Sequence, residues 1–147
     1  MGKVTTIKGD LFNAPKGSII IHACNTQGAW GAGIAKDFAK RFPKARDLYS
    51  WYCKEYGPSL LGTCLLLPAG DHTIGCLFTS KSFGRFVDKP DRILASTKLA
   101  ITDLIRQYVL KKPLHTCKIN SGMFGVPWSD TKDILKESEA DFVVYDF

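Results

Sequence analysis

The feature that most constrains this chain is a short apolar segment that leads into a glycine-rich stretch and then into a helix. Ser18–Ala23 contains three consecutive isoleucines, a pattern typical of a β-strand that is buried on both faces. Gly28–Gly33 follows, and apolar residues then recur at helical spacing from Ile34 to Phe42, before Pro43 is expected to end the helix. A strand covered on both faces requires helices on both sides of its sheet, so this segment predicts an α/β fold.

The remaining segments complete the sheet within one domain. Further strands are predicted at Val4–Lys8, Cys64–Leu67, Ile74–Thr79, Thr116–Ile119 and Phe142–Tyr145. Helices are predicted at Ala45–Tyr56, from Pro90 to Tyr108 and at Ser129–Glu137. This order predicts a three-layer α/β/α fold with a central mixed six-stranded sheet. The length of 147 residues fits a single domain, 1–147, without repeats or a linker.

Composition narrows the class of partner and the compartment. Twenty Lys and Arg residues against fourteen Asp and Glu residues give a net charge of +6, which favours anionic ligands. The basic residues are scattered rather than clustered, so nucleic acid is not the expected partner. Five cysteines without a CxxC pair indicate free thiols in a reducing compartment, and we expect a cytoplasmic or nuclear protein. No apolar stretch approaches the length of a membrane span, and a monomer is expected.

The stretch from Asn25 to Ala35 is the strongest candidate for ligand binding. Glycines allow a backbone to approach a ligand closely, and the N-terminus of the following helix attracts anions. The Lys and Ser/Thr of a Walker loop are absent after Gly33, and the glycine spacing does not match GxGxxG. The segment is therefore interpreted as a diphosphate-binding loop of another kind, with a glycine-rich turn that serves only packing as the alternative.

A second loop of similar character extends from Ile119 to Trp128. It too follows a predicted strand, contains glycines and precedes a helix. Ligands of open α/β sheets bind at the carboxyl ends of the strands, so Gly9-Asp10, residues 22–33 and residues 120–128 are expected to meet there. Phe124 is expected to offer a flat face to a sugar, or alternatively to fill the loop as a buried aromatic.

These motifs together resemble the macrodomain family. Gly9-Asp10-Leu11, His22–Asn25 with Gly31–Ala35, and Ser121–Gly125 occur in the family's order over nearly the whole chain. Ile119–Gly122, Phe124–Trp128 and Phe78–Ser80 are similar to its fungal ADP-ribose 1''-phosphate phosphatase branch. The chain is shorter than that branch between the long helix and Thr116.

The resemblance implies that the ligand is ADP-ribose or its 1''-phosphate. It implies that Asp10 binds the adenine amino group, although a turn cap is the alternative for this residue alone. It further implies that Asn25 binds the distal ribose hydroxyls and that two loops enclose the diphosphate. The implied binding residues are Gly9, Asp10, Leu11, Ala23, Cys24, Asn25, Trp30, Gly31, Ala32, Gly33, Ile34, Ala35, Asn120, Ser121, Gly122, Met123, Phe124, Gly125 and Val126.

The expected catalytic residues are His22 and Asn25. An imidazole beside the distal ribose would activate water or protonate the leaving oxygen, whereas a lone histidine beside an apolar run is more often a core residue. Lys81 is a further candidate for stabilising phosphate charge. The sequence shows no CxxxxxR nucleophile, GxSxG elbow, DxD pair or His/Asp/Glu cluster, so no metal and no cofactor are expected.

The favoured interpretation is a phosphatase that converts ADP-ribose 1''-phosphate, a by-product of tRNA splicing, to ADP-ribose and phosphate. One alternative is an ADP-ribosyl hydrolase acting on modified proteins, and another is a non-catalytic reader of ADP-ribose. One hydrolase branch of the family uses a lysine and an aspartate of the second loop. Phe124 occupies that aspartate's position here, which weighs against this mechanism.

Overall fold

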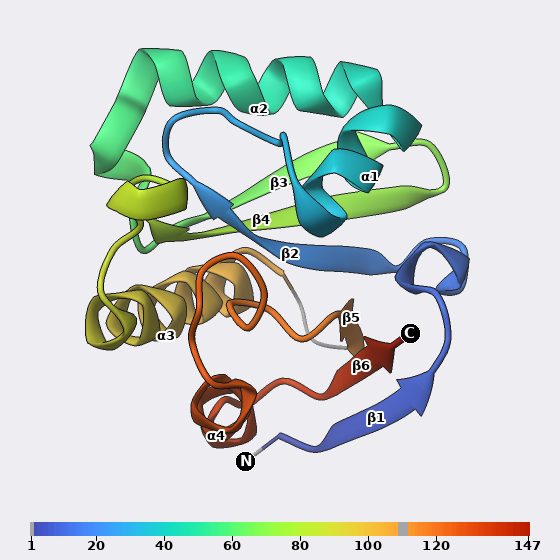
Figure 1. Cartoon of the computed structure of the whole chain (residues 1–147). Helices are drawn as coiled ribbons and strands as arrows, with labels where there is room; N and C mark the ends of the chain where they lie inside the picture. The colour runs from blue at the N-terminus through green and yellow to red at the C-terminus, as the bar shows by residue number, and fades with distance from the viewer. Residues whose placement is uncertain (1, 109–111) are drawn as a thin grey trace.

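The computed structural model describes residues 2–108 and 112–147. Its strands form one sheet in the order β1-β6-β5-β2-β4-β3 (Figure 1). Only the pair β3 and β4 is antiparallel, so the sheet is mixed, as the sequence predicts. The strands are β1 (Val4–Lys8), β2 (Ile19–Asn25), β3 (Cys64–Ala69), β4 (His72–Ser80), β5 (Leu114–Thr116) and β6 (Phe142–Asp146).

Helices cover both faces of the sheet, which confirms the three-layer prediction. The helices are α1 (Gly33–Arg41), α2 (Pro43–Tyr56), α3 (Pro90–Gln107) and α4 (Trp128–Glu137), with short 3-10 helices at Leu11–Asn13, Gly57–Leu60 and Gly84–Phe86. Figure 1 shows α1 and α2 on one side of β2 and β4 and α3 and α4 on the other. Two separate cores result, one on each face.

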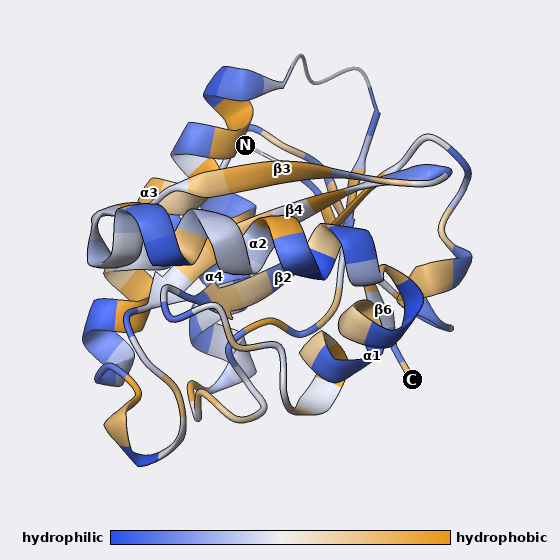
Figure 2. Ribbon diagram, turned by 90° about the horizontal axis from the view of Figure 1, so that it is seen from above, coloured by the Kyte–Doolittle hydropathy of each residue, from blue (hydrophilic) through white to orange (hydrophobic). Residues whose placement is uncertain are grey.

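Alternation along β2 assigns its side chains to these two cores. Ile20 packs with α1 and α2, whereas Ile19 and Ile21 pack with α3 and α4. Residues two apart on a strand share a face, so His22 and Cys24 lie on the same side as Ile20. Figure 2 shows the mainly hydrophobic colours of the strands behind the hydrophilic outer turns of α2.

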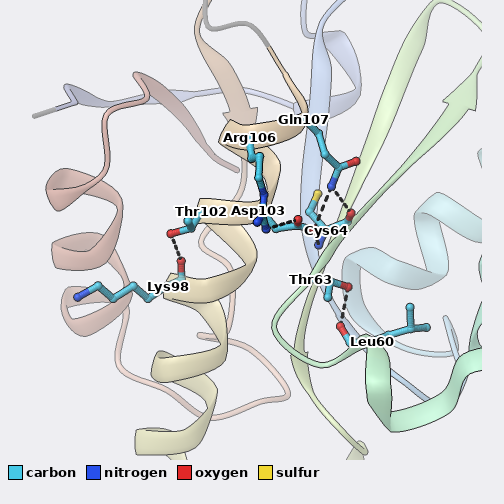
Figure 3. A network of polar contacts seen from close by, with 8 residues as sticks. All are labelled: Leu60, Thr63, Cys64, Lys98, Thr102, Asp103, Arg106 and Gln107. Carbon is cyan, nitrogen blue, oxygen red and sulfur yellow. Dashed lines mark hydrogen bonds and ion pairs between the residues drawn. The ribbon is translucent and has the colours of Figure 1, made fainter.

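The edge strand β3 is fastened to α3 by polar contacts with its backbone (Figure 3). The Cys64 amide donates to the Asp103 carboxylate at 2.8 Å, and the Gln107 side chain donates to the Cys64 carbonyl at 2.9 Å. These bonds occupy backbone groups that an edge strand otherwise leaves open to pairing with another chain. They lie on the face opposite to α1 and α2.

One predicted strand is wrong. The predicted strand Thr116–Ile119 is not observed, because β5 ends at Thr116 and the chain then turns. The turn includes a bond from the Ile119 amide to the Cys117 carbonyl, and Asn120 has a φ of 66°. Ile119 is buried in the core on the side of α3 and α4, and Cys117 is partly buried. The first helix ends before Pro43, as predicted. The next helix begins at Pro43 itself, two residues before the predicted start at Ala45, since proline suits the first turn of a helix. Within residues 2–108 and 112–147, none of the helices is apolar over a length that would cross a membrane.

Candidate functional site

A cavity of about 640 Å³ lies at the carboxyl ends of β2 and β5. This volume falls within the range of small-molecule sites. Two loops far apart in sequence form most of its wall, which is the convergence that the sequence predicts. The lining residues are Ala23, Cys24, Asn25, Ala29, Trp30, Gly31, Ala32, Gly33, Ile34, Ala35, Phe83, Gly84, Cys117, Lys118, Ile119, Asn120, Ser121, Gly122, Met123 and Phe124.

The first loop is shaped by the side chain of Asn25. Its Oδ1 accepts hydrogen bonds from the amides of Gln27 at 3.0 Å and Ala29 at 3.3 Å, and its Nδ2 donates to the Ala29 carbonyl at 2.9 Å. The buried Tyr49 hydroxyl donates to the Asn25 carbonyl at 2.7 Å and approaches Oδ1 at 3.1 Å. Asn25 therefore holds the loop in shape from the edge of the cavity, and a direct bond to ribose hydroxyls stays a prediction.

Trp30–Ala35 presents a row of free backbone donors. Within residues 2–108 and 112–147, none of the amides of these six residues donates a hydrogen bond to another protein group. The start of α1 has no side-chain cap and no acidic residue in its first turn. Such a helix start carries partial positive charge and unsatisfied N–H groups, and all six residues line the cavity.

The second loop is anchored by Asn120, which is buried. Its Oδ1 accepts from the Thr79 hydroxyl at 2.9 Å, and its Nδ2 donates to the Thr97 hydroxyl at 3.0 Å. Its carbonyl accepts from the Val126 amide at 2.9 Å, which closes the loop. A satisfied buried amide of this kind fixes a unique backbone path, because breaking it leaves polar groups without partners.

The turn above this anchor supplies a second group of free donors. The amides of Gly122, Met123 and Phe124 donate to no other group among the described residues, and all three residues line the cavity. Met123 is largely exposed at the rim, and Phe124 is half-buried. Nine backbone N–H groups from two distant segments thus border one cavity, an arrangement suited to a ligand with several phosphate oxygens.

The loop after β4 forms part of the cavity wall, and from this loop the sequence analysis named only Lys81. Phe83 and Gly84 line the cavity, whereas Lys81 is not among the lining residues and its amide donates to Asp88. Among the described lining residues Lys118 is the one with a positive charge, and its Nζ lies 3.1 Å from Asp146. The sequence offered a signal for Phe83 and Gly84, because this loop also follows the carboxyl end of a parallel strand.

The structure does not bring His22 to the cavity, which corrects its predicted role. Its side chain is completely buried, stacks on Phe38 with ring centroids 4.0 Å apart and meets the edge of Trp30 at 4.9 Å. A general acid or base needs hydrogen-bond reach of its substrate or of a bound water. His22 lies beneath the site, in contact with Trp30, which itself lines the cavity.

The neighbouring Cys24, which lines the cavity, has a perturbed thiol. Burial alone raises the pKa of its thiol, but a hydrogen bond with Cys76 and the imidazole of His22 outweigh burial and lower the pKa to about 5. The Cys24 sulfur lies 3.5 Å from His22 Nε2. The structure thus places a polar cluster in the floor of the cavity, and Cys76 was not predicted to belong to it.

Five predicted binding residues lie away from the cavity wall: Gly9, Asp10, Leu11, Gly125 and Val126. Asp10 caps the short helix that follows β1, because its Oδ1 accepts from the Phe12 amide at 2.9 Å. Its other oxygen lies 3.8 Å from Arg41. The capping alternative is thus observed, and adenine recognition by Asp10 stays a prediction. Leu11 and Val126 are core residues beneath the loops.

With the geometry established, similarity to known proteins decides the family. The sequence profile described as the Macro domain matches residues 21–135, a range that contains most of β2, both loops and most of α4. The chain belongs to the macrodomain family. A relative from Lodderomyces elongisporus named ADP-ribose 1''-phosphate phosphatase is 43% identical to this macrodomain and covers 97% of both chains. A protein of the same name from Aspergillus oryzae is 37% identical over 97% of this macrodomain and 92% of its own length.

The fold has counterparts among solved macrodomains of distant sequence. The macrodomain of Mycobacterium tuberculosis DarG superposes with a TM-score of 0.81 and 22% identity, and it covers 100% of this chain and 99% of its own. At that identity the similarity shows the fold alone. The match over the whole chain agrees with the single mixed sheet described above.

Proposed function

We propose that this macrodomain hydrolyses ADP-ribose 1''-phosphate to ADP-ribose and phosphate. The observation that carries the proposal is that nine residues of two distant loops line one cavity, and that their amides donate to no other group in the described part of the chain. Phosphate oxygens satisfy such donors, and charge-assisted bonds of this type contribute about 1.5–3 kcal/mol each. The names of the fungal relatives identify the substrate class within that chemistry.

The chemistry at the terminal phosphate is assigned to positioning and charge stabilisation. Water attacks the phosphorus atom, the bond to the 1'' oxygen breaks, and the water proton passes to a product oxygen. None of the residues that line the cavity is an aspartate or glutamate. Preorganised amides and the start of α1 stabilise the negative charge that develops on the phosphoryl oxygens. Asn25 and His22 act indirectly, since Asn25 holds the first loop in shape and His22 packs against Trp30 beneath the cavity.

The test is release of free phosphate from ADP-ribose 1''-phosphate by the purified protein. We expect continuous release that ADP-ribose inhibits, because product and substrate share the diphosphate site. Gly122→Val, which narrows the cavity at the second loop, is expected to abolish release. Lys98→Met, an exposed change on α3 away from this cavity, serves as the control with unchanged activity.

Two results would contradict the proposal. Tight binding of ADP-ribose without phosphate release would leave a non-catalytic reader. Removal of ADP-ribose from modified proteins without action on the 1''-phosphate would leave an ADP-ribosyl hydrolase. Cytoplasmic or nuclear localisation and tRNA splicing as the source of the substrate belong to the same proposal, and an action on ADP-ribosylated proteins is its alternative.

A further inference from the structure

The loop between β4 and α3 places an exposed aromatic ring at the cavity. Phe83 lines the cavity, yet 46% of the residue is exposed to solvent. Among the described residues, neither of the two hydrophobic cores includes it. An apolar ring contributes to stability when it leaves water, and in the free protein this ring does so only in part. Its open surface is therefore available to a ligand that enters the cavity.

Hydrogen bonds hold this loop in one shape. The buried Ser80 hydroxyl donates to the Ser82 carbonyl at 2.7 Å and accepts from the Asp88 amide at 3.0 Å. The Asp88 carboxylate in turn accepts from the Lys81 amide at 3.0 Å. Because these bonds tie the two ends of the loop together, the backbone that carries Phe83 is ordered before a ligand binds. Such preorganisation lowers the entropic cost of a contact.

The same loop is fastened to the first glycine-rich loop. The Thr26 amide donates to the Ser80 carbonyl at 3.2 Å, and the Thr26 hydroxyl donates to the Lys81 carbonyl at 2.9 Å. Asn25 is the strand partner of Ser80 where β2 and β4 end side by side. Phe83 is therefore held at a fixed place next to the end of β2.

The order of the strands places Phe83 at one end of the ligand. The second loop follows β5, the first loop follows β2 and the Phe83 loop follows β4, so the three lie in a row along the end of the sheet (Figure 1). The free amides belong to the first and second loops, so a diphosphate bound there has Phe83 on its β4 side. Asp10, which is predicted to bind adenine, follows β1 on the far side of β5. The distal ribose is then the group that faces β4.

We propose that Phe83 is a specificity-determining residue, whose ring packs on the distal ribose and favours ligands that carry this sugar over ADP alone. The inference rests on the proposed function, since that function makes ADP-ribose the ligand. A phenyl ring presents a flat apolar face, which the C–H groups of a ribose cover while its hydroxyls point to polar groups. This role is separate from the one predicted for Phe124, which lies on the second loop.

The test is a calorimetric titration of the full chain with ADP-ribose and, separately, with ADP, which lacks the distal ribose. Phe83→Ala is expected to raise the dissociation constant for ADP-ribose about 3- to 10-fold, the usual size of an aromatic contact, and to leave that for ADP unchanged. Phe83→Tyr keeps the ring and is expected to keep both wild-type values. Phe86→Ala is the matched control with both values unchanged, because Phe86 lies on the same loop, is 70% exposed and is not among the lining residues.

Equal weakening of both ligands in Phe83→Ala would overturn the inference, because it would place the ring on the ADP part. Unchanged binding of ADP-ribose would also overturn it. If Phe83→Ala loses its melting transition, nuclear Overhauser effects in the wild-type complex decide instead. The inference requires contacts between the Phe83 ring protons and the distal ribose, and contacts with adenine alone, or none, would refute it.

Failure of the proposed function would be seen in a different measurement. Wild-type protein that binds ADP-ribose but releases no phosphate from the 1''-phosphate would refute that function, and the comparison of ADP-ribose with ADP would still decide the role of Phe83. Wild-type protein that binds neither ligand would refute both proposals.

Discussion

Gly122→Val separates ligand binding from folding at the second loop. A Cβ atom added to Gly122 meets no other atom within 4 Å, and the residue's φ lies outside the left-handed region. The free protein therefore accepts the side chain, and its stability is expected to change by less than about 0.5 kcal/mol. The residue lines the cavity, so the added methyl groups occupy space that a bound anion needs.

The size of the binding defect follows from the lost amide contacts. Moving a phosphate away from the Gly122–Phe124 turn removes at least one charge-assisted hydrogen bond, worth about 1.5–3 kcal/mol. The dissociation constant for ADP-ribose is therefore expected to rise by about 10- to 150-fold in isothermal titration calorimetry. Gly122→Ala, which adds only the Cβ atom, is expected to lie between the wild type and Gly122→Val.

Gly75→Ala is the converse control. Its added Cβ would lie 2.9 Å from Ile21 Cγ1 in the sheet, so this variant is expected to lose stability by about 1–3 kcal/mol. Differential scanning fluorimetry then gives opposite orders for the two glycines: Gly75→Ala melts lower, and Gly122→Val melts like the wild type. Binding by Gly122→Val that equals the wild type would refute the placement of a phosphate at this turn.

Three further predictions concern the first loop and the buried thiols. Tyr49→Phe removes two hydrogen bonds to Asn25, so the free energy of unfolding in urea is expected to fall by about 1–3 kcal/mol. ADP-ribose binding is also expected to weaken, and an unchanged affinity would contradict the role of Asn25 in shaping the first loop. Gly28→Ala is expected to lower the melting temperature, because the φ of this residue is +78° and the new Cβ would lie 3.2 Å from the Cα atom of Ser50 on α2. An unchanged melting temperature would contradict this prediction. Burial raises the pKa of the Cys64 thiol above 9.0, so the folded protein keeps this proton at a pH where the unfolded chain loses it. The free energy of unfolding is therefore expected to fall as the pH rises through 9. Cys64→Ser should make this decline less steep, and an unaltered dependence of stability on pH would contradict the prediction.

The sequence predicts the sheet well because burial on both faces leaves a direct signal. Three consecutive isoleucines on a strand point to both faces of the sheet, so they predict a central strand that is buried on both faces. They lie in β2. The position of the two glycine-rich loops is also predictable, because each follows a parallel strand and both therefore lie at the same end of the sheet. Their convergence on one cavity is thus a consequence of topology.

The failures arise where burial and side-chain direction are hidden from a linear pattern. Ile119 packs in the core from a turn, and apolarity alone does not distinguish such a turn from a strand. His22 shares a face of β2 with Cys24, which lines the cavity, but it lies two residues further from the strand end, where Trp30 and Phe38 pack against its ring. The contribution of Cys76 depends on strand register, which the sequence does not show.

The central claim is that amides from two distant segments bind one diphosphate. The direct measurement is a titration of ¹⁵N-labelled protein with ADP-ribose, followed by amide chemical shifts. The account predicts that the amides of Trp30–Ala35 and Gly122–Phe124 shift together along one saturation curve, while amides of α3 near Lys98 stay in place. Shifts in only one of the two segments, or in neither, would contradict it.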